Sequence, residues 1–137
     1  MTFQPMPVIP PDAELWWTGY LRAFLVGRDE TYAANVSVGK TKPNDNRPRI
    51  VAVRRDGGAI EGVVDNPRLA FRVWATKDQE ASDLARLIVG AIRAAQGQGP
   101  VVGIVNVFGP SPIPDSSQPQ YLVNAEVRHR CTALSSA

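Results

Sequence analysis

The chain has 137 residues, 44% of them hydrophobic and 20% charged, and a formal net charge of only +2 at pH 7. This composition is typical of one globular domain with its own core, and the small charge does not indicate a dedicated nucleic-acid-binding protein. All apolar runs are shorter than the roughly 20 residues that cross a bilayer, so no membrane partner is expected. Because Cys131 is the only cysteine and His129 the only histidine, an internal disulfide and a cysteine-rich zinc site are excluded.

Residues 1–11 are expected to form an extended arm, because prolines at positions 5, 7, 10 and 11 fix φ and remove backbone donors. The arm lacks the basic and apolar parts of a secretory signal, so we expect synthesis in the cytoplasm. Asp12 is placed to cap a helix whose apolar stripe consists of Trp17, Tyr20, Leu21, Phe24 and Leu25. Trp16 lies off this stripe, which predicts either a subunit contact or packing at a half-buried edge.

Two strands are predicted in the next part of the chain. Residues 34–38 form a short candidate strand, and the loop after it contains Pro43 and Pro48. Residues 49–55 alternate between two apolar sides and end at the turn Asp56-Gly57-Gly58. We expect the residues between this turn and Pro67 to form a loop or hairpin tip.

Residues 68–97 predict a strand that leads directly into a long helix. The strand places Leu69, Phe71, Val73 and Ala75 on one face, and Arg72 and Trp74 on the other. Thr76 and Gln79 have the spacing of a capping box, and Gly97 is expected to end the helix. The apolar stripe of the helix consists of Leu84, Leu87, Ile88, Ala91, Ile92 and Ala95. Gly90 costs about 1 kcal/mol relative to alanine, which indicates a close approach of another element.

Two strands complete the chain. Val101 to Phe108 is a continuous apolar run, which predicts a central strand, and residues 121–130 alternate between an apolar and a polar side. Together the elements predict an α+β fold, a two-layer arrangement with a mostly antiparallel sheet of four or five strands and both helices on one face. The single domain is expected to span residues 12–131, followed by a short tail at 132–137.

The residue types that carry catalysis or metal binding do not form a convincing site. Ala34–Thr41 fits a loose phosphate-loop pattern, but its first glycine is missing and Pro43 and Pro48 prevent a helix from following it. His129 and Cys131 lack a third, orienting group, so a packed histidine is expected. The carboxylates Asp78, Glu80 and Asp83 are explained by the positive end of a helix.

Basic residues gather in the middle of the chain at Lys40, Lys42, Arg47, Arg49, Arg54 and Arg55. They are compatible either with contact to a polyanion such as DNA or with an ordinary solvated loop, and they lack the aromatic residues that stack on single strands. An outward Trp74 next to Arg72 has the composition of a protein–protein hot spot.

Several features follow one another between Asp12 and Arg130: an aromatic helix, the strand IVAVRR with a DGG turn, DNPRLAFRVWA before a helix rich in Ala, Leu and Arg, VVGIVNVFGP, and the closing YLVNAEVRHR. In this succession the chain resembles the tail terminator, or tail completion, proteins of long-tailed bacteriophages, especially those that infect actinobacteria. The resemblance implies an α/β subunit that forms a ring, usually a hexamer, on the head-proximal end of the tail tube. Such a ring halts tube polymerisation and joins the tail to the head.

The resemblance also implies the partners and the location. The chain would be a virion protein assembled in the host cytoplasm, in contact with copies of itself, the tube protein and a head-closure or connector protein, with genomic DNA near the lumen. It would catalyse no reaction and need no cofactor. A ring requires two complementary surfaces on each subunit, for which the aromatic helix, the arm and the outward Arg72 and Trp74 are candidates.

The side chains that we expect at subunit or partner interfaces are Trp16, Arg54, Arg55, Arg72, Trp74, Arg128 and Arg130. The loop that we expect near DNA carries Lys40, Lys42, Arg47 and Arg49. Two alternatives stay open. The chain is a head-closure or connector protein of the phage neck, or it is a nucleic-acid-binding α/β module that uses the basic segment Lys40–Arg55.

Overall fold

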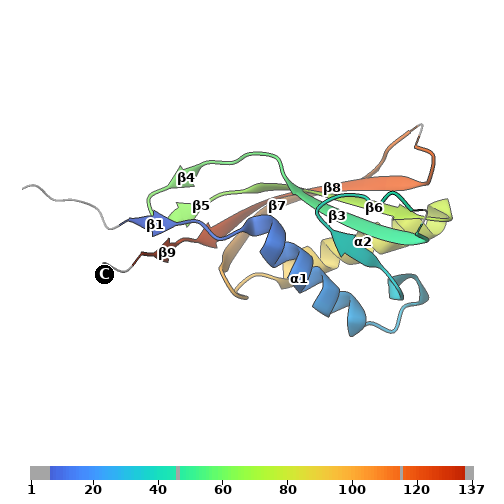
Figure 1. Cartoon of the computed structure of the whole chain (residues 1–137), viewed down its shortest axis with the longest axis horizontal. Helices are drawn as coiled ribbons and strands as arrows, with labels where there is room; N and C mark the ends of the chain where they lie inside the picture. Colours follow the sequence, from blue (N-terminus) through green and yellow to red (C-terminus); the bar gives the residue numbers. More distant parts are fainter. Residues whose placement is uncertain (1–6, 46, 115, 135–137) are drawn as a thin grey trace, which may run out of the picture.

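Two helices and a mixed sheet form two layers, an α+β arrangement that does not close into a barrel (Figure 1). The computed structural model describes residues 7–45, 47–114 and 116–134. The first six residues of the predicted arm and the last three of the predicted tail therefore lie outside the described residues. Neither α-helix in the described part is long and apolar enough to cross a membrane.

The helices are α1 (Ala13–Val26) and α2 (Asp78–Ala94), with a short 3-10 turn at Thr31–Ala33. The strands are β1 (Val8–Ile9), β2 (Ser37–Gly39), β3 (Arg49–Arg55), β4 (Ile60–Glu61), β5 (Val64–Asp65), β6 (Arg68–Ala75), β7 (Val101–Pro112), β8 (Gln120–Arg130) and β9 (Thr132–Ala133). The predicted bounds of β3 are confirmed, and so is the strand that leads into α2. Period-two alternation of large apolar residues specifies both strands.

The main sheet has seven strands, more than the four or five predicted. Its order is β2-β3-β6-β8-β5-β4, and β7 pairs with the other edge of β8. Among the strands that the structure describes, only β2 and β3 pair in parallel, and all other pairs are antiparallel. The added strands β4 and β5 form a small hairpin in the segment predicted as a loop, and each is too short to leave a periodic pattern.

Strand β7 lies at an edge of the sheet, so its predicted central position is wrong. Its apolar run suggested burial on both faces, but Val102, Val105 and Phe108 are exposed. Three register shifts interrupt its pairing with β8. The run is continuous because one set of side chains packs beneath the helices while another set remains at the surface.

The ends of the described chain meet in a separate two-stranded sheet. Strand β1 of the predicted arm pairs with β9 of the predicted tail, with Val8 opposite Ala133 and Ile9 opposite Thr132. Part of both segments is thus joined to the domain. Pairing of two-residue strands depends on tertiary contact, which sequence patterns do not report.

The helix caps illustrate one correct and one wrong prediction. The side chain of Asp12 accepts a hydrogen bond from the Leu15 amide at 3.1 Å, which confirms the predicted cap of α1. Lys77 is the N-cap of α2 and makes no side-chain cap bond. The predicted Thr76 cap is wrong because the Thr76 hydroxyl instead donates to the Pro48 carbonyl at 3.5 Å, which connects the end of β6 to the chain before β3.

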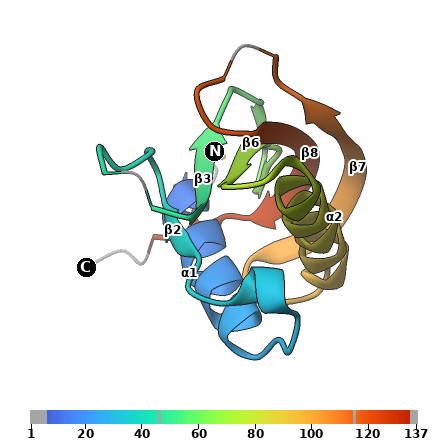
Figure 2. The same cartoon turned by 90° about the vertical axis from the view of Figure 1, so that its right-hand side faces the viewer.

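The main core lies between the sheet and both helices, so the prediction that they share one face is confirmed. Helix α1 covers β2 and β3, and α2 covers β6, β8 and β7 (Figure 2). The predicted stripes supply the core residues Trp17 and Leu21 of α1 and Leu84 and Ile88 of α2. Gly90 is exposed, and a Cβ added there would meet nothing within 4 Å, so the predicted close approach is wrong.

Candidate functional site

Five exposed arginines lie on the face of the sheet that the helices leave uncovered. They alternate with core residues along three neighbouring strands: Arg54 on β3, Arg68 and Arg72 on β6, and Arg128 and Arg130 on β8. On β6, for example, Leu69, Phe71 and Val73 are buried beneath the helices, so the residues between them point the other way. We call this set the arginine face.

Most arginines of the arginine face form no ion pair with the described residues. Arg54 lies 3.4 Å from Asp56, whereas the other four arginines have no acidic partner within 4.0 Å among the described residues. Glu126 lies opposite Arg68 across β6 and β8 without forming such a pair. Arginine is enriched at protein interfaces, where its planar group forms bidentate hydrogen bonds and stacks on apolar surface.

The predicted interface residues divide between the two faces. Arg54, Arg72, Arg128 and Arg130 belong to the arginine face, while Arg55 points to the helix side and binds Asp65 there. Trp16 also lies on the helix side, where it stacks on Tyr20 with ring centroids 5.1 Å apart. The structure thus brings together four of the seven residues.

Trp74 is buried, so the prediction of an exposed tryptophan beside Arg72 is wrong. It packs with Ile50 and Ala52 in a second, small cluster on the arginine side of the sheet. The ammonium group of Lys42 lies 5.5 Å above its ring centroid. Gln118, in the loop between β7 and β8, donates to the Arg47 carbonyl at 3.1 Å, so two loops meet at this end of the sheet.

The basic segment Lys40–Arg55 does not form one patch. Lys40 lies 3.8 Å from Asp12 and Arg47 lies 3.0 Å from Asp45. Arg49 pairs with Glu80 of α2, on the helix side of the sheet. Lys40, Arg47 and Arg49 thus have acidic partners, and Arg49 lies on the opposite side of the sheet from Arg54, which weakens the hypothesis of a single polyanion-binding surface.

The phosphate-loop hypothesis also lacks a structural basis. Residues 37–39 of this segment are β2. The described residues between Gly39 and Arg49, which do not include residue 46, contain no helix. Phosphate-binding loops depend on a helix N-terminus directed at the phosphates.

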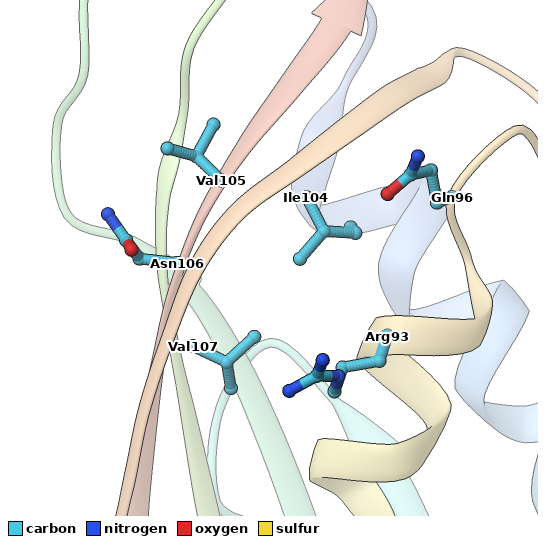
Figure 3. Close-up of a pocket in the computed structure, with 6 residues that line it drawn as sticks. All are labelled: Arg93, Gln96, Ile104, Val105, Asn106 and Val107. Atoms are coloured by element: carbon cyan, nitrogen blue, oxygen red, sulfur yellow. The ribbon is translucent and has the colours of Figure 1, made fainter.

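A hollow of about 350 Å³ lies between the end of α2 and strand β7. Its lining residues are Arg93, Gln96, Ile104, Val105, Asn106 and Val107. In Figure 3 the guanidinium of Arg93 extends from α2 toward β7, with Ile104 and Val107 on the helix side. Val105 and Asn106 point away from the helix together, because the pairing with β8 shifts register between Ile104 and Asn106. Sequence alternation cannot reveal such a shift.

A buried polar group connects α1, β5 and β8. The fully buried carboxylate of Asp65 accepts two hydrogen bonds from Arg55, each of 2.7 Å. Asp65 is paired with His129 across β5 and β8, and His129 Nε2 accepts a 3.0 Å bond from the Trp17 indole. Burial lowers the pKa of His129; the nearby Asp65 raises it less, and Arg55 lowers it further.

This polar group lies in the interior of the subunit and is not exposed at its surface. His129 and Cys131 are both buried, and the ring nitrogen of His129 that faces α1 is already bonded to Trp17. Within residues 7–45, 47–114 and 116–134, no three metal-binding side chains are grouped to hold an ion. Sequence reasoning missed the Arg55–Asp65 pair because Asp65 comes from a two-residue strand.

Comparison with models of known protein families gave no match to this chain. A search of curated proteins also gave no match.

Proposed function

We propose that the chain is a structural virion protein, a tail terminator of a long-tailed bacteriophage. Copies of it form a ring, a hexamer in the simplest case, on the head-proximal end of the tail tube. The ring stops tube polymerisation and joins the tail to a head-closure or connector protein. Assembly takes place in the host cytoplasm.

The observation that supports this proposal best is the arginine face. A sheet in a two-layer fold has one face covered by helices, and here the other face carries Arg68, Arg72 and Arg128 without acidic partners in the described chain. Monomeric proteins more often distribute both signs of charge over such a surface. A protein partner with acidic residues would supply the missing partners, as charge complementarity at interfaces does.

The polar interior supports an assembly role in a second way. Arg55, Asp65 and His129 bind one another or Trp17 inside the subunit. Such a group specifies the packing of α1 on the sheet and presents no accessible nucleophile or base. The cations of the Lys40–Arg49 loop mostly have acidic partners within the chain. We therefore propose that DNA passes near this loop in the lumen of the ring, without a dedicated DNA-binding surface.

The proposal is tested by adding the purified chain to polymerising tail-tube protein and examining the tubes by negative-stain electron microscopy. We expect a ring at one end of each tube and a shorter mean tube length. The double variant Arg72→Glu, Arg128→Glu should cap markedly fewer tubes, because it reverses the charge of the arginine face. The matched control is Lys77→Glu, which reverses an exposed cation at the start of α2.

Circular dichroism establishes that each variant is folded. Wild-type protein that neither binds tubes nor changes their length contradicts the proposal. Binding to a head connector without binding to tubes would favour the head-closure alternative. Sub-micromolar DNA binding with a steep salt dependence would favour the nucleic-acid alternative.

A further inference from the structure

Helix α1 carries apolar residues on the side that faces away from the core. Its inner side buries Trp17, Leu21 and Leu25, yet Leu15 is 61% exposed and Val26 is 87% exposed. Gly19 and Ala23, also exposed, complete an outward strip that we call the α1 stripe: Leu15, Gly19, Ala23 and Val26. A helix that is apolar on both sides is usually covered on both sides.

Arg22, which lies next to the α1 stripe, is turned away from it. Arg22 donates to the Val38 carbonyl of β2 from Nε at 3.2 Å and from Nη2 at 2.8 Å. This contact leaves the stripe apolar. It also occupies a carbonyl at the β2 edge of the sheet, which opposes the addition of another strand there.

A second exposed apolar surface lies on β7, which pairs only with β8 among the described strands. Val102, Val105 and Phe108 form this surface, which we call the β7 patch. Three register shifts bend the strand and disturb the row of backbone groups at its edge. An incoming partner would therefore meet the side chains of the patch more readily than it would extend the sheet.

The two surfaces are at opposite ends of the sheet, and charged residues without an ion-pair partner among the described residues lie beside both. Helix α1 packs against β2 and β3, while β7 lies beyond β8 at the other end of the strand order (Figure 2). Asp29 lies three residues after the end of α1 and is exposed, without a cation within 4.0 Å among the described residues. Arg93 and Arg128, which border Val105, likewise have no acidic partner within 4.0 Å in the described chain, and Glu61 and Glu126 line the same hollow as Arg128.

We infer that the α1 stripe of one copy docks on the β7 patch of the next copy, so that subunits associate head to tail. The inference rests on the proposed ring and specifies its subunit contact. Docking would bury apolar area at the centre and bring Asp29 of one copy toward Arg93 and Arg128 of another. Two different surfaces at opposite ends form a heterologous contact, which closes into a ring when its rotation allows.

The test uses Val26→Lys for the α1 stripe and Val105→Lys for the β7 patch, with sedimentation velocity over a range of concentrations. Each variant alone should weaken self-association at least about thirtyfold, the loss expected for a central contact residue. An equimolar mixture should form a one-to-one dimer, because each variant retains the surface that the other has lost. Val63→Lys is the control, since Val63 is exposed to 59% and belongs to neither surface.

Several outcomes would overturn the inference. These are wild-type protein that remains monomeric at every concentration, a Val26→Lys or Val105→Lys variant that associates like wild type, and a mixture of the two that stays monomeric. The experiment also separates this inference from the proposed function. If the variants associate in the expected pattern but the wild-type protein does not cap tubes, the subunit contact is supported and the tail role is contradicted. If Val26→Lys and Val105→Lys both cap tubes as wild type does, the tail role stands and the inferred subunit contact is wrong.

Discussion

The two faces of the sheet are built from the same strands but have different physical roles. On β3, Val53 and Arg55 point toward the helices, and Arg54 between them points to the uncovered face. The helix side is filled with apolar side chains and contains the Arg55–Asp65 pair, whereas four of the five arginines on the other side have no acidic partner within 4.0 Å among the described residues. Arg54 and Arg55 are adjacent in the chain and thus have different environments.

This difference separates stability from association. An arginine that neutralises a buried carboxylate is required by the fold, because an uncompensated buried charge is costly. An arginine on an open face contributes little to the stability of the subunit and is available to a partner. Substitutions on the helix side should therefore change the free energy of unfolding, and substitutions on the arginine face should change binding.

The sharpest test of this separation is the pair Arg55 and Arg54. Arg55→Ala should lower the free energy of unfolding by about 3 kcal/mol, because it leaves the fully buried Asp65 without its cation. The estimate is at the low end for a buried pair, since the side chain of Arg55 is 27% exposed. Urea unfolding followed by tryptophan fluorescence measures the change.

Arg54→Ala is the matched control. Its side chain is 70% exposed and its nearest acid, Asp56, is also at the surface. The expected change is below about 0.5 kcal/mol. Equal losses in the two variants would contradict the separation of the faces.

A smaller effect is expected from the pH dependence of His129. Burial holds the pKa of this side chain below its ordinary value of 6.5, so the unfolded chain takes up a proton before the folded chain does. The free energy of unfolding should therefore fall as the pH drops below about 6.5 and the difference in bound protons develops. Above that pH both states are neutral at this site, and His129 contributes no slope.

His129→Gln removes the titration and keeps a group able to accept from the Trp17 indole. Its unfolding free energy, measured by urea titration from pH 7.5 to pH 5.5, should decline less steeply than that of wild type. Parallel curves for the two proteins would show that this buried histidine does not govern the acid sensitivity of the helix side.

The elements with strong local patterns could be predicted from the sequence. Alternation specified β3 and β6, and the Asp12 cap and the two apolar stripes specified the helices. Period two also places Arg72 and Arg128 on a common side once the strands pair. Local pattern therefore suffices for much of the fold and for the direction of several site residues.

The remaining features depend on contacts between distant segments. Trp74 is buried in a cluster with Ile50 and Ala52 and lies beneath the ammonium group of Lys42, and Arg55 differs from Arg54 because Asp65 comes from a two-residue strand. The shift that turns Val105 and Asn106 to one side arises from pairing with β8. None of these features has a periodic trace in the sequence, so neither the ion-pair partners nor the β7 patch could be predicted.

A gain in stability is expected on the outer side of α2. Gly90→Ala should raise the free energy of unfolding by about 1 kcal/mol, because the new methyl group enters open space and glycine is a poor helix former. Gly97→Ala is the contrasting control, since φ is +84° there and alanine would be strained. Thermal unfolding of both variants measures the opposite signs.

Self-association of Gly90→Ala then extends the comparison from the sheet to the helices. The inferred ring contact uses the outer side of α1 and not that of α2, so this variant should associate as wild type does. If Gly90→Ala is more stable but associates less than wild type, a neighbouring subunit contacts α2. The α1 stripe is then not the contact surface.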